Sequence, residues 1–206
     1  MSASNRNILN EIDTLVDLLN WRAQSYPDCS TYTFLNHGEA VNVSLSNQKL
    51  AQQAKGVGAQ LQALNPVGKR ILLLLSPGLD YIAAFLGCVY AGAVAVPVYP
   101  PRANRRLSRL QAIISDAQPS IVLTTSDLLT NLGSLGQSKL GLDNLTWLSV
   151  DEISCDLANQ WQEPSINGDS LAFLQYTSGS TAAPKGVMVS HRHLLHNLGL
   201  IGQHFD

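Results

Sequence analysis

One short segment of the chain gathers hydroxyl groups, glycines and a single lysine. Glycine lets the backbone approach an anion closely, and consecutive N–H groups can converge into an anion-binding concavity. Serine and threonine hydroxyls add donors, and a lysine ammonium adds a compact positive charge suited to phosphate. The segment therefore predicts a polyphosphate-binding loop, although the same composition also occurs in ordinary surface loops. The candidate binding residues are Thr177, Ser178, Gly179, Ser180, Thr181, Lys185 and Gly186.

The order of residues excludes the Walker A type of nucleotide loop. In that loop the lysine follows a glycine and precedes a serine or threonine. Here Pro184 precedes Lys185, and Gly186 follows it. An apolar run over residues 171–176 leads into the segment and predicts a strand in front of the loop.

The segments that must position this loop alternate between helical and strand patterns. Apolar residues at helical spacing predict helices over residues 13–25, 46–64, 79–91 and 104–117. Apolar runs bounded by turn residues predict strands over residues 31–35, 41–44, 71–75, 93–98, 120–124, 145–150 and 171–176. Residues 71–98 form a βαβ unit, whose strands should be parallel. We therefore expect an α/β fold with a mostly parallel sheet and flanking helices, and a surface connection over residues 160–169.

Composition excludes several classes of protein. With 206 residues, of which 45% are hydrophobic and 14% charged, the chain can bury a sizeable core. A net charge of −2 gives no reason to expect nucleic acid or an anionic membrane as a partner. The polar residues 1–7 lack the apolar core of a signal peptide, which favours a cytoplasmic protein.

The longest apolar stretch and the cysteines fit the same interpretation. Residues 79–98 are interrupted by Asp80, two glycines and a proline, so no membrane span is expected. Cys29, Cys88 and Cys155 are widely spaced and odd in number, which predicts free, buried thiols rather than disulfides or a metal cluster.

Residues 176–187 closely resemble the phosphate-loop motif YTSGSTGxPKGV of the adenylate-forming, or AMP-binding, enzyme superfamily. The order of predicted helices and strands also resembles the N-terminal part of an adenylating enzyme. Val96-Pro97-Val98-Tyr99-Pro100-Pro101-Arg102, Gln175 and the run Met188-Val189-Ser190-His191 are most similar to the fatty acyl-AMP ligase branch.

The chain departs from the motif at Ala182, where the family usually has glycine. If that position takes a positive φ, alanine introduces strain of roughly 1 kcal/mol. If φ is negative there, the exchange has almost no effect. A second departure is His193, which stands where relatives more often have asparagine.

The resemblance implies an ATP-dependent, Mg²⁺-assisted ligase. Such an enzyme joins a fatty acid or another carboxylic acid to AMP, releases pyrophosphate, and passes the acyl group to an acyl carrier protein or a polyketide or peptide synthase module. Residues 177–181 would cradle the β- and γ-phosphates, and Lys185 would balance their charge. A Mg²⁺ ion would bind mainly through the phosphates, so no metal ligand is named in the chain.

The family's adenine-binding and ribose-binding segments and its catalytic lysine lie downstream of the phosphate loop. Residues 1–206 are therefore expected to be a partial N-terminal AMP-binding domain, truncated after that loop, without the C-terminal domain and with no catalytic residue of its own. The fragment alone is expected to be inactive. Alternatives are an acyl-CoA synthetase, an amino-acid-adenylating domain, or an inactive fragment that serves as a binding module.

Several other residues keep two interpretations. Arginines recur at helical spacing and form one basic stripe, at Arg102, Arg105, Arg106 and Arg109. This stripe is either a solvated helix face or a docking surface for an acidic carrier protein. Tyr176 is either a strand-end aromatic or a ligand contact. Tyr99 and the prolines after it either end a strand or contribute to a site, and the former is preferred.

Overall fold

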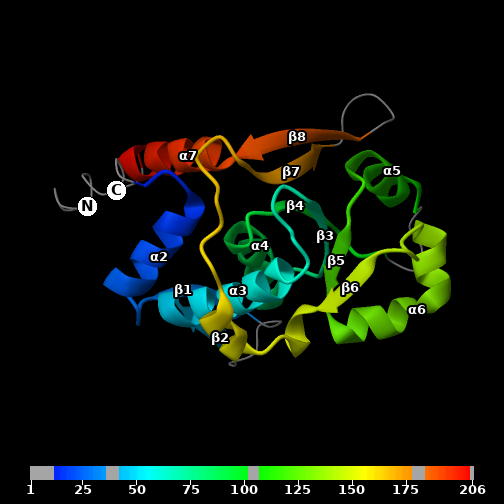
Figure 1. Cartoon of the computed structure of the whole chain (residues 1–206), viewed down its shortest axis with the longest axis horizontal. Helices are drawn as coiled ribbons and strands as arrows, with labels where there is room; N and C mark the ends of the chain where they lie inside the picture. The colour runs from blue at the N-terminus through cyan, green and yellow to red at the C-terminus, as the bar shows by residue number, and fades with distance from the viewer. Residues whose placement is uncertain (1–11, 36–41, 102–106, 178–183, 205–206) are drawn as a thin grey trace.

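A computed structural model describes residues 12–35, 42–101, 107–177 and 184–204. These residues form a six-stranded sheet in the order β6-β5-β3-β4-β7-β8, and a separate two-stranded sheet of β1 and β2. Helices cover both faces of the larger sheet (Figure 1).

The N-terminal part consists of helix α2 (Leu15–Ser25), strands β1 (Ser30–Leu35) and β2 (Asn42–Ser46), and helix α3 (Asn47–Gln62). The two strands pair in antiparallel fashion. Thr14 caps α2 and forms a capping box with Asp17, which satisfies free amides of the first helical turn. The side chain of Ser46 caps α3 by accepting a hydrogen bond from the amide of Lys49.

The central part alternates strands and helices. It contains β3 (Arg70–Leu74), α4 (Leu79–Tyr90), β4 (Val94–Val98), α5 (Ser108–Ala117), β5 (Ile121–Thr124), α6 (Ser126–Leu140) and β6 (Thr146–Ser149). Strands β3, β4, β5 and β6 are parallel to their neighbours. The predicted βαβ unit over residues 71–98 is confirmed.

The last part carries the predicted phosphate loop. Short 3-10 helices η1 (Val150–Glu152) and η2 (Cys155–Gln160) lead to strand β7 (Leu171–Thr177). Strand β7 is parallel to β4 and antiparallel to β8 (Lys185–Ser190), which is followed by helix α7 (His191–His204). The β7–β8 hairpin runs along one side of the molecule and delivers α7 next to α2 (Figure 1).

The buried strands separate two apolar clusters. Leu72, Leu74 and Val122 point to the cluster that includes α5, whereas Ile71, Leu73 and Leu123 point to the cluster that includes α3 and α4. Because successive side chains of a strand alternate between faces, a strand that is buried on both sides must be apolar throughout. This explains the continuous apolar run from residue 71 to 75 and confirms the predicted α/β fold with a mostly parallel sheet.

The structure adds two elements, leaves the start of one predicted helix untested and corrects one prediction. Helix α6 and strand β8 were not predicted. The helix expected from residue 104 is described only from Ser108 onward, because residues 102–106 lie outside the described part. The cysteines were expected to be buried, but only Cys88 is; Cys29 is exposed and Cys155 is half-buried, although all three are free.

Candidate functional site

The β7–β8 hairpin places two of the predicted phosphate-binding residues opposite each other. Thr177, the last residue of β7, is paired across the strands with Lys185, the first residue of β8. Both side chains are exposed. Ser178, Gly179, Ser180, Thr181 and Ala182 lie outside the described residues, so the structure places only the two ends of the loop. The side chains of Lys185 and Thr177 therefore project from neighbouring positions at the same end of the hairpin.

The alternation of strand side chains puts these two residues on the same face as Gln175. Residues 175 and 177 are two positions apart on β7, and Lys185 is directly opposite Thr177. Gln175 is exposed and lines a large pocket. The face of the hairpin that carries Lys185 is thus continuous with one wall of that pocket.

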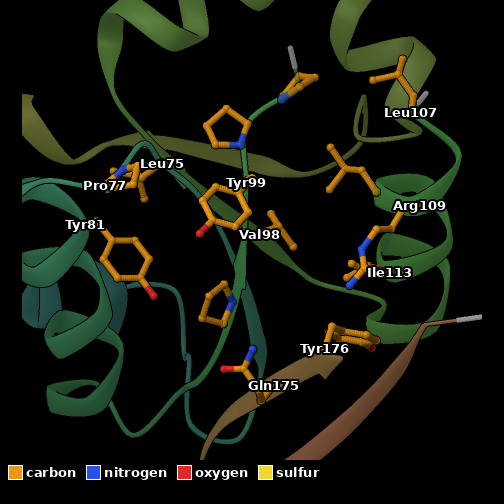
Figure 2. A pocket seen from close by; sticks show the side chains of 14 residues that line it. Leu75, Pro77, Tyr81, Val98, Tyr99, Leu107, Arg109, Ile113, Gln175 and Tyr176 are labelled. Carbon is orange, nitrogen blue, oxygen red and sulfur yellow. The ribbon is translucent and has the colours of Figure 1, made fainter. Parts of the chain in front are cut away.

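The pocket has a volume of about 720 Å³, which lies within the range of small-molecule binding sites. It opens at the carboxyl ends of β3, β4 and β7, where α/β sheets commonly bind their ligands. Figure 2 shows Tyr81 of α4 on one side, Ile113 and Arg109 of α5 on the opposite side, and Gln175 and Tyr176 between them. Its walls are mainly apolar; they also include Leu75, Pro77, Pro97, Val98, Tyr99, Pro100, Pro101, Leu107 and Leu110.

Two of the ambiguous sequence features meet at this pocket. Tyr99 directly follows β4, as the strand-ending interpretation predicts, yet its side chain is 75% exposed and lines the cavity. Arg109, the one described member of the arginine series, is exposed and also lines the cavity. Arg102, Arg105 and Arg106 lie outside the described residues. Tyr99 and Arg109 therefore both contribute to the lining of the pocket.

Tyr176 occupies the opposite face of the hairpin and is only 7% exposed. Its hydroxyl donates a hydrogen bond to the Oδ2 atom of Asp116 on α5. Burial raises the pKa of Tyr176, and the hydrogen bond and negative charge of Asp116 raise it further, while the charge of Arg70 opposes the shift. The phenol therefore stays protonated and remains a donor at neutral pH. This contact favours the structural interpretation of Tyr176 over a direct ligand role.

Gly186 makes the position of the Tyr176 ring possible. The two residues are partners across the hairpin. A Cβ atom added to Gly186 would lie 2.9 Å from Cζ and 3.1 Å from the hydroxyl oxygen of Tyr176. Because real Cβ atoms do not approach ring atoms so closely, any larger residue at 186 would displace the ring. The glycine of the motif thus has a packing reason besides its predicted place in the phosphate site.

Sequence reasoning missed Asp116 and Tyr81. Asp116 contacts a residue 60 positions away in the sequence, and no local sequence pattern predicts such a contact. Tyr81 lies in a helix that was correctly predicted, but its exposure to the pocket depends on the packing of α4 against the sheet. Burial raises the pKa of Tyr81, with smaller contributions from Tyr99 and Cys88, so this phenol also remains neutral.

The strand after the loop is fixed at its far end by two histidines. Ser190 and His193 form a reciprocal pair: the Ser190 amide donates to Nδ1 of His193 at 3.2 Å, and the His193 amide donates to the Ser190 hydroxyl at 3.4 Å. This is the geometry of a capping box, with imidazole as the acceptor in place of glutamate or glutamine. His193, whose effect the sequence left unassigned, therefore caps the first turn of α7.

His191 joins the same turn to the start of α2. It is 1% exposed, and its Nδ1 atom accepts a hydrogen bond from the amide of Leu15 at 3.2 Å. Next to it, the amide of Arg192 donates to the carbonyl of Gly168, whose own amide donates to Oδ2 of Asp13. The end of the hairpin is therefore tied to the N-terminal helix.

The described residues contain neither a candidate metal cluster nor a candidate membrane span. Within the described ranges, no group of three or more histidine, cysteine, aspartate or glutamate side chains could hold a metal ion. In that same part of the chain, none of the helices combines the length and the apolar character needed to cross a membrane.

Comparison with known proteins gives consistent matches. The family model described as "AMP-binding enzyme" matches residues 19–206. The chain is 42% identical over 195 residues to the medium-chain-fatty-acid–[acyl-carrier-protein] ligase JamA of Moorena producens, covering 93% of this chain and 33% of that protein. It is 33% identical over 174 residues to the long-chain-fatty-acid–AMP ligase FadD32 of Mycobacterium marinum, covering 83% of this chain and 28% of the relative.

Solved structures agree with these relatives. The fatty acyl-adenylate ligase of L. pneumophila, in complex with acyl adenylate and pyrophosphate, is similar with a TM-score of 0.86 and 39% identity. That match covers 96% of this chain and 34% of the ligase. A peptide synthetase structure, McyG with phenylalanyl-adenylate, has a TM-score of 0.78 at 23% identity and therefore shares only the fold. The chain spans about a third of the length of the curated relatives it matches.

Proposed function

Because this chain belongs to the AMP-binding enzyme family, we propose that it forms the N-terminal part of a ligase that activates a carboxylic acid with ATP. A carboxylate oxygen of the acid bonds to the α-phosphorus of ATP. The bond from that phosphorus to the bridging oxygen breaks, and pyrophosphate leaves with the electron pair. One observation carries the proposal: Lys185 and Thr177 flank the motif loop together, at the carboxyl edge of the sheet and beside a pocket.

The chain's contribution to this reaction is to hold the leaving group. Carboxylate and triphosphate repel each other, so the protein must neutralise charge and fix the geometry of attack. Lys185 supplies a positive charge, and Thr177 supplies a hydroxyl donor from the opposite strand. Ser178, Gly179, Ser180 and Thr181 are proposed to complete the cradle around the β- and γ-phosphates, together with the backbone of Gly186.

We also propose that a Mg²⁺ ion accompanies the nucleotide. Such an ion binds mainly through phosphate oxygens and water, with few protein groups. The hydroxyl-rich character of residues 177–181 offers neutral oxygen atoms that fit this role. When bound, Mg²⁺ would neutralise part of the triphosphate charge.

A fatty acid is the proposed substrate, and an acyl carrier protein is the proposed acceptor. The support is the relatives: JamA is named as a medium-chain-fatty-acid–[acyl-carrier-protein] ligase, and FadD32 as a long-chain-fatty-acid–AMP ligase. The mainly apolar walls of the pocket beside the loop agree with an apolar substrate or acceptor arm. We further propose a cytoplasmic location.

The experiment that tests this function uses a full-length ligase that carries this chain as its N-terminal part. The protein is incubated with ATP, Mg²⁺ and a series of fatty acids, amino acids and short carboxylic acids, and acyl-adenylates are measured by mass spectrometry. Formation of fatty acyl-adenylates, followed by transfer to carrier protein rather than to CoA, is expected. Acyl-CoA as the product would identify a CoA synthetase, aminoacyl-adenylate would identify an amino-acid-adenylating domain, and no adenylate with any acid would favour an inactive binding module.

A further inference from the structure

The hydrogen bond between Tyr176 and Asp116 links the hairpin to a helix that is remote in sequence. Tyr176 is the residue before Thr177, so its ring lies at the very base of the predicted phosphate loop. Asp116 is in the last turn of α5, 60 residues earlier. The hydrogen bond therefore joins the base of the loop to a helix that is far away in the sequence.

The ring of Tyr176 is held on three sides. On one side is Gly186, where an added Cβ would meet the ring at 2.9 Å. On another side is the apolar cluster that includes Ile113 and Ile114 of α5. The third constraint is the hydrogen bond to Asp116, which involves a charged acceptor and is therefore stronger than a bond between neutral groups. A ring held in this way leaves β7 and β8 little freedom to shift against α5.

Helix α5 also forms one wall of the pocket, through Arg109, Leu110 and Ile113. Gln175 and Tyr176 line the same cavity from the hairpin. The distance from Thr177 and Lys185, the described ends of the loop, to that wall thus depends on how α5 and the hairpin are joined. Asp116 and Tyr176 provide the polar connection between these two elements.

We propose that Asp116 is a positioning residue for the phosphate loop, acting through the hydroxyl of Tyr176 to hold the β7–β8 hairpin against α5. This role rests on the proposed function of the loop. Asp116 itself does not touch the nucleotide. Its carboxylate fixes the phenol, and the phenol fixes the base of the hairpin, so that Thr177 and Lys185 at the two ends of the loop stay at a constant distance from the pocket.

The alternative is that the hydrogen bond contributes only to overall stability. The two roles differ in what a substitution changes. A purely stabilising contact would alter the unfolding midpoint without altering the affinity of the folded protein for phosphate. A positioning contact would alter local opening of the hairpin and phosphate affinity in the same variants, under conditions in which the protein is fully folded.

The test uses the 206-residue chain and four variants: Asp116→Asn, Tyr176→Phe, the double variant, and Asp28→Asn as a control. Asn retains the shape of Asp but lacks its charge, and Phe retains the ring but lacks the hydroxyl. Asp28 is exposed and precedes β1, remote in sequence from α5 and from the hairpin. Amide hydrogen exchange is measured at Tyr176, Lys185 and Gly186, and tripolyphosphate is titrated into each protein while the amides of Thr177 and Lys185 are followed by NMR.

Both single variants are expected to exchange hairpin amides about tenfold faster, since a hydrogen bond to a charged group contributes enough to change an equilibrium by that factor. The double variant should exchange no faster than either single variant, because the two groups act through one contact. The dissociation constant for tripolyphosphate should rise severalfold in all three and stay unchanged in Asp28→Asn. In addition, the absorbance titration of tyrosine in Asp116→Asn should show a lower pKa for Tyr176.

Each other outcome decides against a specific claim. Unchanged exchange in Asp116→Asn and Tyr176→Phe overturns the positioning role, whatever the phosphate affinity. Faster exchange with unchanged tripolyphosphate affinity also overturns it and leaves only a stabilising contact. If tripolyphosphate at millimolar concentration moves neither amide in the unsubstituted protein, the phosphate-binding function of the loop fails, and the positioning role fails with it.

Discussion

The Nδ1 atom of His191 accepts a hydrogen bond from the backbone amide of Leu15, 176 residues earlier in the chain, at 3.2 Å. This contact fastens the first turn of α7, and with it the end of the β7–β8 hairpin, to the start of α2. An imidazole that accepts from an amide must be unprotonated at that nitrogen. The contact is therefore sensitive to pH.

Stability should fall as the pH drops below about 6.5, the ordinary pKa of histidine. Burial lowers the pKa of His191, and the charges of Asp17 and Asp13 oppose the shift without cancelling it. The unfolded chain therefore binds a proton at pH values where the folded chain does not, and the free energy of unfolding decreases as pH falls through that window. Urea unfolding between pH 7.5 and 5.5 measures the effect.

The matched comparison for this prediction is His191→Gln against His196→Gln. Glutamine at 191 does not titrate, so that variant should lose part of the pH dependence, whereas His196 is exposed and its replacement should leave the dependence intact. Identical pH profiles for His191→Gln and the unsubstituted protein would refute the assignment.

Gly186→Ala should destabilise the protein by about 1–3 kcal/mol, the usual cost of forcing an extra methyl group into a packed site. The added Cβ would stand 2.9 Å from the Tyr176 ring. Gly199→Ala is the control, because a Cβ there meets nothing within 4 Å and lies in helix α7, where alanine is favoured by up to about 1 kcal/mol. Equal unfolding free energies for the two variants would contradict the described packing of the hairpin.

Gly87→Ala tests the packing between α3 and α4 in the same way. A Cβ at Gly87 would lie 2.4 Å from Cγ1 of Val57, which is 2% exposed. We expect a loss of about 1–3 kcal/mol from the single change. Shortening Val57 to alanine removes the Cγ1 contact at 2.4 Å but leaves its Cβ 2.6 Å from the added atom, so the clash is relieved only in part. The double variant Gly87→Ala/Val57→Ala should therefore lose somewhat less than the sum of the two single variants. Simple additivity in urea unfolding would argue that the two helices do not pack at this point.

The order of elements could be predicted well because strands 71–75 and 93–98 are apolar throughout and the turns between them contain glycine and proline. Helix α6 was missed because Gly133, which has a φ of 57°, interrupts its pattern, and Gly136 weakens it further. Strand β8 was missed because its alternation of apolar and polar residues is short. Its pairing partner, β7, lies on the other side of the predicted phosphate loop. Pairing across a loop is a tertiary feature, which local propensity does not encode.

The residues of the candidate site likewise include some that the sequence predicted and some that it did not. Lys185, Thr177 and Gly186 were predicted from their residue types and their order; the structure places them at the two ends of the loop, and their role in phosphate binding stays a prediction. Asp116 and Tyr81 were not found, because their importance depends on which helix packs beside the hairpin and at what rotation. The burial of Tyr176 follows from the strand period, but its partner does not.

The chain of 206 residues alone should not catalyse ATP–pyrophosphate exchange. A few charge-assisted hydrogen bonds, each contributing about 1.5–3 kcal/mol, must offset about 4–15 kcal/mol of lost translational and rotational freedom. The phosphate loop by itself is therefore expected to bind ATP or tripolyphosphate only in roughly the millimolar range, which is too weak to support efficient exchange. Radiolabelled pyrophosphate exchange with the purified chain checks this, and turnover comparable to that of a full-length ligase would contradict the prediction.

We propose that Lys185 holds the triphosphate during activation of the acid. The most direct measurement is fatty-acid-dependent ATP–pyrophosphate exchange by a full-length ligase that carries this chain, with Lys185→Ala compared with Lys49→Ala, an exposed lysine on α3. Lys185→Ala should lower kcat/KM for ATP by about 10- to 100-fold, as expected for the loss of one charge-assisted contact of about 1.5–3 kcal/mol, while Lys49→Ala should behave as the unsubstituted enzyme. Equal exchange rates in the two variants would show that Lys185 does not hold the triphosphate.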